Sequence, residues 1–368
     1  MTRSEKKKRY DGMLIFVVLL LVAAGLVILY STSAYNGQVK FHDPFHYLKK
    51  QGFATLLGLF GMALIARVDY HKWVPLAIPA YVTSIILSVA VIFFGDEYNG
   101  SKRWLSLSPI SFQPSEFAKV AVIFFLACLV SRNVQRMKRF RTMILMMIPV
   151  LPIVGLVGAS NLSTAIIILG IAVVLIFVAD PKYVRFILMG SIGVGFMTVF
   201  LAMESYRLER LAIWRHPEQY EKGYQTLQGL YAIGSGGLFG RGLGNSVQKL
   251  GFLPEAQNDM IFSIICEELG LIGAGFIILL FLILIWRFFV ISTKASDLLG
   301  ALIAAGAMAH MMIQVILNIA VVTNSIPNTG ITLPFISYGG TSVVFLLLEM
   351  GLVLSVSNYE GLRYGGSE

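Results

Sequence analysis

Long apolar runs separated by short polar segments dominate this 368-residue chain. A helix of about 20 apolar residues crosses a hydrocarbon core of roughly 30 Å, and the runs have this length. They lack the two-residue alternation that is typical of an outer-membrane barrel. The pattern predicts an all-α polytopic membrane protein with ten transmembrane helices, over roughly 12–33, 51–67, 73–95, 116–131, 143–159, 163–180, 184–203, 260–286, 298–322 and 339–357.

The composition agrees with this class, since 57% of the residues are hydrophobic and only 13% are charged. Such values exclude a soluble protein of ordinary composition. The two cysteines, Cys128 and Cys266, lie inside predicted spans, so neither a disulfide framework nor a thiolate metal site is expected. Without an internal repeat or a linker, residues 1–368 are expected to form one transmembrane domain.

The positive charges predict the orientation in the membrane. Five basic residues precede the first span, and a cytoplasmic N-terminus places most of the 29 Lys and Arg residues on the cytoplasmic side. Ten spans then make both termini cytoplasmic, and a large loop at about 204–259, between the seventh and eighth spans, becomes extracytoplasmic. The basic run at 132–141 and the net charge of +9 are explained by topology, so no nucleic-acid partner is expected.

Two acids mark the entrance to the eighth span. Pro254 suits a helix start, which would place Glu255 and Asp259 on one face near the positive end of the helix dipole. A carboxylate at the boundary of a spanning helix is costly, so we favour a functional role for Asp259; for Glu255, helix capping and function are both open. Glu267 and Glu268 lie deeper, and at least one is expected to face the interior with a partner or a proton.

Other polar residues suggest a site on the same outer face. Pro114 is expected to start the fourth span, with Glu116 and Lys119 three apart on one face. This pair is either a simple interfacial ion pair or part of a substrate site. Arg103 is a stronger candidate for binding substrate, because a guanidinium chelates phosphate oxygens through two parallel hydrogen bonds.

The remaining candidates lie in irregular segments or in the ninth span. The glycine-rich stretch 223–245, which contains Arg241, matches neither a P-loop nor a Rossmann turn and predicts shaped backbone over a cavity. Gln314 and Asn318 are four apart, and such buried amides either link helices or belong to a site. Ser337 lies in the Pro- and Gly-rich segment 323–338, which predicts a rigid, non-helical outer loop.

Four stretches of the chain carry a resemblance to a known family. They are Arg103-Trp104; Gln113-Pro114-Ser115-Glu116 with Lys119; Phe252-Leu253-Pro254-Glu255 with Asp259 and Glu267-Glu268-Leu269-Gly270; and Asn318 through Pro327-Asn328-Thr329-Gly330 to Leu333-Pro334-Phe335 and Gly339-Gly340-Thr341-Ser342. In this order they resemble the SEDS family (shape, elongation, division and sporulation), and the chain looks most like its FtsW and SpoVE branch, with RodA more distant. One departure is Asn161, where many members carry an acidic residue.

The resemblance implies a peptidoglycan glycosyltransferase of the bacterial cytoplasmic membrane. Such an enzyme polymerises lipid II into glycan strands at the outer face, for cell division, shape or sporulation, and releases undecaprenyl diphosphate. It also implies a class B penicillin-binding protein, the transpeptidase, as a partner, together with divisome or elongasome proteins. The family's essential acid corresponds to Asp259.

These inferences together give an expected site. Asp259 is the catalytic candidate, as general base in an inverting transfer. Mg²⁺ or Mn²⁺ is a candidate cofactor, with no ligands assigned. The rival functions are a lipid II flippase or transporter and a non-catalytic scaffold for the penicillin-binding protein. The substrate-binding candidates are Arg103, Glu116, Lys119, Arg241, Gln314, Asn318 and Ser337, and the supporting candidates are Glu255, Glu267 and Glu268.

Overall fold

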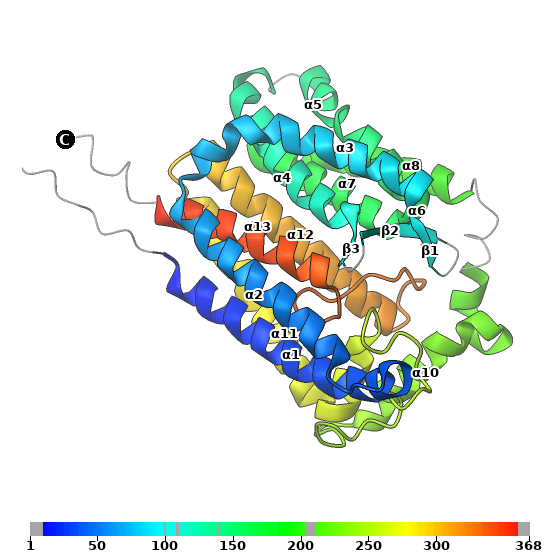
Figure 1. Ribbon diagram of the computed structural model, residues 1–368. Helices are drawn as coiled ribbons and strands as arrows, with labels where there is room; N and C mark the ends of the chain where they lie inside the picture. Colours follow the sequence, from blue (N-terminus) through cyan, green and yellow to red (C-terminus); the bar gives the residue numbers. More distant parts are fainter. Residues whose placement is uncertain are drawn as a thin grey trace, which may run out of the picture.

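The computed structural model describes residues 10–98, 101–107, 110–137, 140–180, 182–202 and 211–359, which form a helical bundle with a small sheet at one end (Figure 1). Each predicted span coincides with one helix, or with a helix pair in the case of 143–159. The helices are α1 (Gly12–Phe41), α2 (His46–Arg67), α3 (Ala77–Phe94), α4 (Pro114–Asn133), α5 (Phe140–Met147), α6 (Val150–Ser160), α7 (Leu162–Ala179), α8 (Tyr183–Ala202), α10 (Tyr224–Gly236), α11 (Ile261–Lys294), α12 (Leu298–Val322) and α13 (Gly340–Asn358).

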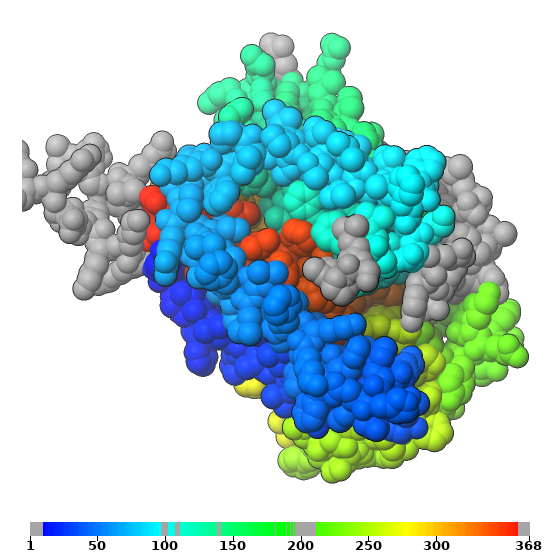
Figure 2. All heavy atoms as spheres, viewed as in Figure 1, coloured from blue at the N-terminus to red at the C-terminus, as the bar shows by residue number. Residues whose placement is uncertain are grey.

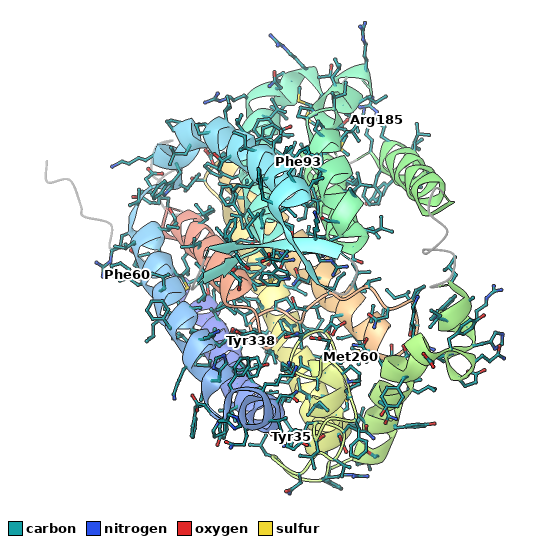
Figure 3. All side chains as sticks on the ribbon, turned by 45° about the vertical axis from the view of Figure 1, so that its right-hand side comes forward. Tyr35, Phe60, Phe93, Arg185, Met260 and Tyr338 are labelled. Atoms are coloured by element: carbon teal, nitrogen blue, oxygen red, sulfur yellow. The ribbon has the colours of Figure 1, made fainter. Side chains whose placement is uncertain are left out.

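Seven helices in the described part of the chain are long and apolar enough to cross a membrane, or up to eight if the bent pair α5 and α6 forms one span. The α2 helix falls outside this set, because Lys49, Lys50 and Gln51 near its start lower its hydropathy. The outer surface fits a lipid environment, since Phe53, Phe93 and Phe94 are each at least 70% exposed. Figure 3 shows Phe93 on the outer side of α3. The prediction of a polytopic helical protein is therefore confirmed.

The α12 helix lies at the centre of the bundle, where it packs against α4, α7, α11 and α13 (Figure 1). The two ends of the described chain meet, because the backbone N–H of Asp11 donates to Ser357 Oγ at 3.3 Å. The first and last helices therefore begin and end at the same end of the bundle. The predicted basic segment before the first span lies outside the described residues, as does Arg363.

A three-stranded antiparallel sheet follows α3, and the sequence did not predict it. Its strands are β1 (Asp96–Tyr98), β2 (Ser101–Leu107) and β3 (Ile110–Phe112), with β2 in the middle. Asp96 pairs with Trp104, and Leu105 pairs with Phe112. The strands β1 and β3 have only three residues each, and β2 does not alternate between apolar and polar residues, so no periodic signal marks them. Their pairing satisfies the backbone hydrogen bonds. The sheet fixes the position of Arg103 in β2.

The α11 helix was predicted as one continuous span, but it breaks at Gly270, where φ is 66°. A Cβ at this position would lie 2.4 Å from Leu238 O, so only glycine fits. The loop after α10 enters the break and pairs with backbone groups that the helix leaves free. Leu271 N–H donates to Gly237 O at 2.9 Å, and Arg241 N–H donates to Glu267 O at 2.9 Å. The shaped backbone expected from the glycine-rich stretch is thus docked into α11.

Candidate active site

A cavity of about 740 Å³ opens at the end of the bundle that carries the sheet. Figure 2 shows the molecule hollowed between the blue α1–α2 region and the cyan α3–β2 region, with the orange and red C-terminal part of the chain on its floor. Its lining comes from segments far apart in sequence. The predicted site residues that line it are Arg103, Glu116, Lys119, Glu255, Asp259 and Gln314.

Asp259 lies in the turns that precede α11, and it is only 8% exposed. Its backbone carbonyl accepts a hydrogen bond from Asn318 Nδ2 at 2.9 Å, which fixes this turn to α12. Burial raises the pKa of the Asp259 carboxyl to about 7, and the nearby Glu255 charge acts in the same direction, while Arg103 opposes both. Such a carboxyl exchanges a proton near neutral pH, as a general base must.

Gly330 separates Asp259 from Arg103. Its φ is 69°, and a Cβ built there would lie 3.3 Å from Arg103 Nη1 and 3.8 Å from Asp259 Oδ2. The Arg103 side chain is also anchored, since its Nε donates to Ser160 O at 3.2 Å. A left-handed glycine thus lets the guanidinium and the carboxylate approach the same point of the cavity.

Glu116 and Lys119 form the expected pair near the start of α4. Pro114 is the first residue of this helix, as predicted. Lys119 Nζ lies 2.8 Å from Glu116 Oε1 and donates to Gln314 Oε1 at 2.8 Å. Ser342 Oγ donates to the other carboxylate oxygen of Glu116 at 2.7 Å. Both charges are buried and paired, so the ion pair exists and also faces the cavity.

His310 and Glu349, which are not among the predicted site residues, extend this polar cluster into the bundle. His310 Nε2 lies 2.9 Å from Gln314 Oε1, and His310 Nδ1 lies 2.8 Å from Glu349 Oε2. A usable signal was present, because His310, Gln314 and Asn318 recur every four residues on α12. An ionisable residue inside a span is also a functional candidate by default.

The structure brings neither Asn318 nor Ser337 to the cavity lining. Asn318 Nδ2 donates to Asp259 O and, at 2.7 Å, to Ile331 O, so it holds two cavity segments in place. Ser337 Oγ accepts from Leu333 N–H at 2.8 Å, and its carbonyl accepts from Gln51 Nε2 at 3.3 Å. Both residues stabilise the loop before α13 and do not contact the cavity. For Asn318, this is the first of the two expected roles, that of a buried amide that links segments.

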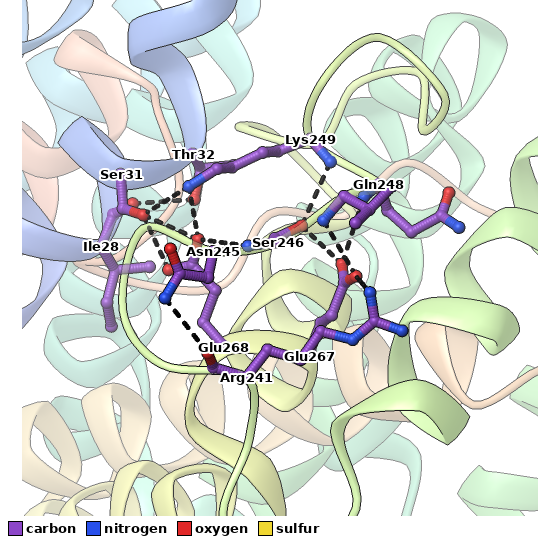
Figure 4. A network of polar contacts seen from close by, with 11 residues as sticks. Ile28, Ser31, Thr32, Arg241, Asn245, Ser246, Gln248, Lys249, Glu267 and Glu268 are labelled. Atoms are coloured by element: carbon purple, nitrogen blue, oxygen red, sulfur yellow. Dashed lines mark hydrogen bonds and ion pairs between the residues drawn. The ribbon is translucent and has the colours of Figure 1, made fainter.

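Arg241, Glu267 and Glu268 belong to a second polar network, away from the cavity lining (Figure 4). Glu268 Oε1 accepts from Lys249 Nζ at 2.6 Å and from Ser31 Oγ at 2.8 Å, while Arg241 Nη1 lies 3.5 Å from Glu267 Oε1. Both glutamates are buried with partners. This network ties the loop before Asp259 to α1 and α11, so the structure does not bring Arg241 to the cavity.

The expected helix start at Pro254 is wrong. Residues 251–260 form turns, and α11 begins at Ile261. Glu255 has a φ of 53°, and its carboxylate accepts from Asn258 Nδ2. This local hydrogen bond competes with helical pairing. Glu255 therefore shares the cavity with Asp259, but not a helical face.

Asn161 and the cavity carboxylates are the remaining polar groups that bear on substrate or metal binding. Asn161 lines the cavity, and its side chain accepts from Thr164 N–H at 3.2 Å as the N-cap of α7. No group of three or more His, Cys, Asp or Glu residues in the described ranges is arranged to hold a metal ion. The carboxylates of Glu116, Glu255 and Asp259 that line the cavity are the oxygen ligands it offers to a hard divalent cation, alongside water or substrate oxygens.

Comparisons with known proteins agree over nearly the whole chain. The family model FTSW_RODA_SPOVE, described as "Cell cycle protein", matches residues 11–361. Stage V sporulation protein E of Bacillus subtilis (strain 168) is 40% identical over 96% of this chain and 98% of its own. A probable peptidoglycan glycosyltransferase FtsW of Geobacter sp. (strain M18) is 35% identical over 95% of this chain and 96% of its own.

Two solved structures share the fold and 28% sequence identity. One is a chain of the structure described as "Structural coordination of polymerization and crosslinking by a peptidoglycan synthase complex", with a TM-score of 0.79 over 96% of this chain and 99% of that chain. The other is the rod shape-determining protein RodA of Thermus thermophilus, with a TM-score of 0.70 over 95% of this chain and 96% of that one.

Proposed function

Because the chain belongs to the FtsW, RodA and SpoVE family of cell cycle proteins, we propose that it is a peptidoglycan glycosyltransferase that polymerises lipid II in cell division or sporulation. It is a multi-pass protein of the bacterial cytoplasmic membrane. The observation that carries this function best is a buried carboxyl, Asp259, with a pKa of about 7 on a cavity that also holds an arginine and a lysine.

In the proposed reaction, Asp259 accepts the proton of the acceptor sugar hydroxyl as that oxygen bonds to the anomeric carbon of the donor. The bond from this carbon to the diphosphate oxygen breaks, and undecaprenyl diphosphate leaves with its electron pair. The developing negative charge is stabilised by Arg103 and Lys119, which face the same cavity. Arg241 takes no part in this step, because it lies in the network around Glu267.

A divalent cation, Mg²⁺ or Mn²⁺, remains a proposal. Asp259 and Glu255 both line the cavity, and Mg²⁺ is commonly bound by one or two carboxylates together with substrate phosphates. When bound, the ion would neutralise part of the charge of the leaving diphosphate.

The proposed topology has ten spans: the seven helices that qualify by length and apolarity, the bent pair α5 and α6 counted as one span, and α2 and α8. Both termini are then cytoplasmic and the cavity is extracytoplasmic, in line with the distribution of positive charge. The contact between Asp11 and Ser357 supports an even number of crossings, because it places both chain ends on one side.

The proposed partner is a class B penicillin-binding protein, within the divisome or elongasome. This proposal rests on the similarity to a chain of a peptidoglycan synthase complex that coordinates polymerization and crosslinking. A flippase remains the second candidate function, because a cavity lined by charges also suits transport of lipid II.

An assay with purified protein tests the proposed function. The protein is incubated with lipid II and Mg²⁺ or Mn²⁺, with and without the penicillin-binding protein. Glycan ladders on a gel are the expected product. Movement of lipid II across proteoliposome membranes without any polymer would favour the flippase instead. If the protein neither polymerises lipid II nor moves it across the membrane, the non-catalytic scaffold would be the remaining function.

A further inference from the structure

A row of buried polar side chains runs from the cavity into the bundle, across three helices. Glu116 and Lys119 on α4 are followed by Gln314 and His310 on α12 and by Glu349 on α13. His310 and Glu349 are 1% and 2% exposed, and neither lines the cavity. The proposed reaction does not use them, although buried ionisable groups within spanning helices are costly.

Only one assignment of donors and acceptors fits all the hydrogen bonds of this row. The Lys119 ammonium has donors alone, so it must face the carbonyl oxygen of the Gln314 amide. The Gln314 Nε2 donates to Thr332 O at 3.1 Å, which agrees with that orientation. Because Gln314 Oε1 can only accept, His310 Nε2 must carry a proton and donate to it.

One further proton lies between His310 Nδ1 and Glu349 Oε2, which are 2.8 Å apart. Among the described residues, no hydrogen-bond donor reaches the other oxygen, Glu349 Oε1, although it is buried. This proton joins the two side chains, while His310 Nε2 keeps its own proton and donates to Gln314, so the His310–Glu349 pair carries no net charge. With Glu116 and Lys119 paired, the whole row carries no net charge.

We propose that His310, oriented by Glu349, is a positioning residue for Lys119. It fixes the Gln314 amide with its oxygen toward the ammonium, so that Lys119 is held where it meets the leaving diphosphate. The inference rests on the proposed function, since it assigns Lys119 to that anion. Without the His310 donor, the amide can turn its NH₂ group toward Lys119, which then has a donor opposite it in place of an acceptor.

A double-mutant cycle separates this role from simple helix packing. The variants are His310→Phe, Lys119→Met and the two combined, assayed for lipid II polymerisation with the full-length protein and its partner. We expect each single variant to lose about tenfold in rate, and the double variant to be no slower than Lys119→Met alone. Multiplied losses would overturn the proposal, because independent sites add in free energy.

A conservative variant tests the hydrogen bond between His310 and Glu349. In Glu349→Gln the amide still donates to His310 Nδ1, so the rate should stay within about twofold of the parent, whereas Glu349→Leu should fall about as far as His310→Phe. Equal losses for the two Glu349 variants would contradict a requirement for this hydrogen bond. Met311→Leu, a volume-conserving change at a buried neighbour on α12, serves as the control for repacking.

The same double-mutant cycle can be measured without turnover, as the affinity of each purified variant for undecaprenyl diphosphate. A parent protein that binds the diphosphate but forms no polymer would refute the proposed function, and the binding cycle would still decide the role of His310. If His310→Phe weakens binding in the parent protein but not in Lys119→Met, the positioning role is supported. If His310→Phe weakens binding equally in both proteins, the role is refuted. If His310→Phe fails to fold, His310→Asn, whose shorter side chain falls short of Gln314, replaces it.

Discussion

Burial and neighbouring charge act together at Asp259 to produce a base suited to neutral pH. The carboxyl loses most of its contact with water, and the nearby Glu255 charge further disfavours ionisation. Arg103 offsets part of this effect across Gly330. The base strength of Asp259 is thus set mainly by its burial, and then by Glu255 from the same run of turns and Arg103 from β2.

The pH dependence of polymerisation should follow this carboxyl. The rate is expected to rise with pH up to about 7 and then to level off, because only the ionised Asp259 accepts a proton. Glu255→Gln removes a like charge, so the acid limb of the profile should move to lower pH. Polymerisation rates of the parent and of Glu255→Gln, measured from about pH 5 to 9, check the profile and its shift. An acid limb at the same pH in both proteins would contradict the effect of Glu255 on Asp259.

Gly330→Ala tests the close approach of Arg103 and Asp259. The substitution adds a methyl group 3.3 Å from Arg103 Nη1 in a left-handed backbone, so we expect about a tenfold loss of polymerisation rate. Gly234→Ala on α10 is the control, because Gly234 lies away from the cavity lining, has no left-handed φ and leaves open space for a Cβ. Equal rates for the two variants would argue against a requirement for glycine at position 330.

Sequence patterns predicted the site as far as spacing within one segment allows. Glu116 and Lys119 were paired correctly, because residues three apart on a helix are neighbours. Asp259 was singled out by its place before an apolar run. By contrast, the link from Gln314 through His310 to Glu349 joins two helices, and Arg241 is drawn to Glu267 by the loop that enters α11. No local pattern encodes such contacts.

At the scale of elements, the apolar periodicity predicted the helices well and their interruptions poorly. All ten predicted ranges fall on helices, since length and apolarity are properties of each segment alone. The break in α11 depends on a loop about 30 residues earlier in the chain, and the start of this helix depends on the local bond between Glu255 and Asn258. Both arise from contacts that compete with helical pairing.

Gly270→Ala should disrupt this break. The new Cβ would lie within 2.4 Å of loop backbone, so the loop or the helix must shift, and we expect a loss of roughly 2–4 kcal/mol in the free energy of unfolding. Thermal unfolding in detergent measures it. Gly275→Ala lies on the same helix with open space around it and should leave stability unchanged or slightly raised. Similar midpoints for both variants would contradict the account of the break.

On the scale of the whole molecule, the bundle separates lipid-facing apolar side chains from an interior that holds paired charges. Phenylalanines on α2 and α3 face outward, while α12 carries its polar residues toward the centre. This arrangement allows a charged cavity at one end of a bundle whose sides carry exposed apolar residues.

The proposed orientation predicts which cysteines an impermeant thiol reagent reaches from outside. In a background where Cys128 and Cys266 are replaced by Ala, Gln219→Cys should react in intact cells or spheroplasts, and Thr293→Cys should react only after permeabilisation. Both positions are exposed, so the difference reports on sidedness. The reverse pattern would invert the proposed topology and place the cavity in the cytoplasm.

The central claim is that Asp259 supplies the base for glycosyl transfer. Its substitution by Asn is expected to preserve the fold and to raise stability above pH 7. The pKa of this carboxyl is raised from its ordinary value of 3.8 to about 7 in the folded protein, so stability falls progressively as pH rises through this range, and the amide removes this cost. An inactive variant can therefore be shown to be folded by its unfolding midpoint.

The most direct test is the rate at which purified Asp259→Asn protein, with its partner, polymerises lipid II at pH 7.5. We expect a loss of at least about 100-fold relative to the parent, the usual contribution of a general base. Glu221→Gln, an exposed change away from the cavity lining, controls for the loss of an acid. Polymerisation by the folded Asp259→Asn variant at the rate of the parent would contradict the account.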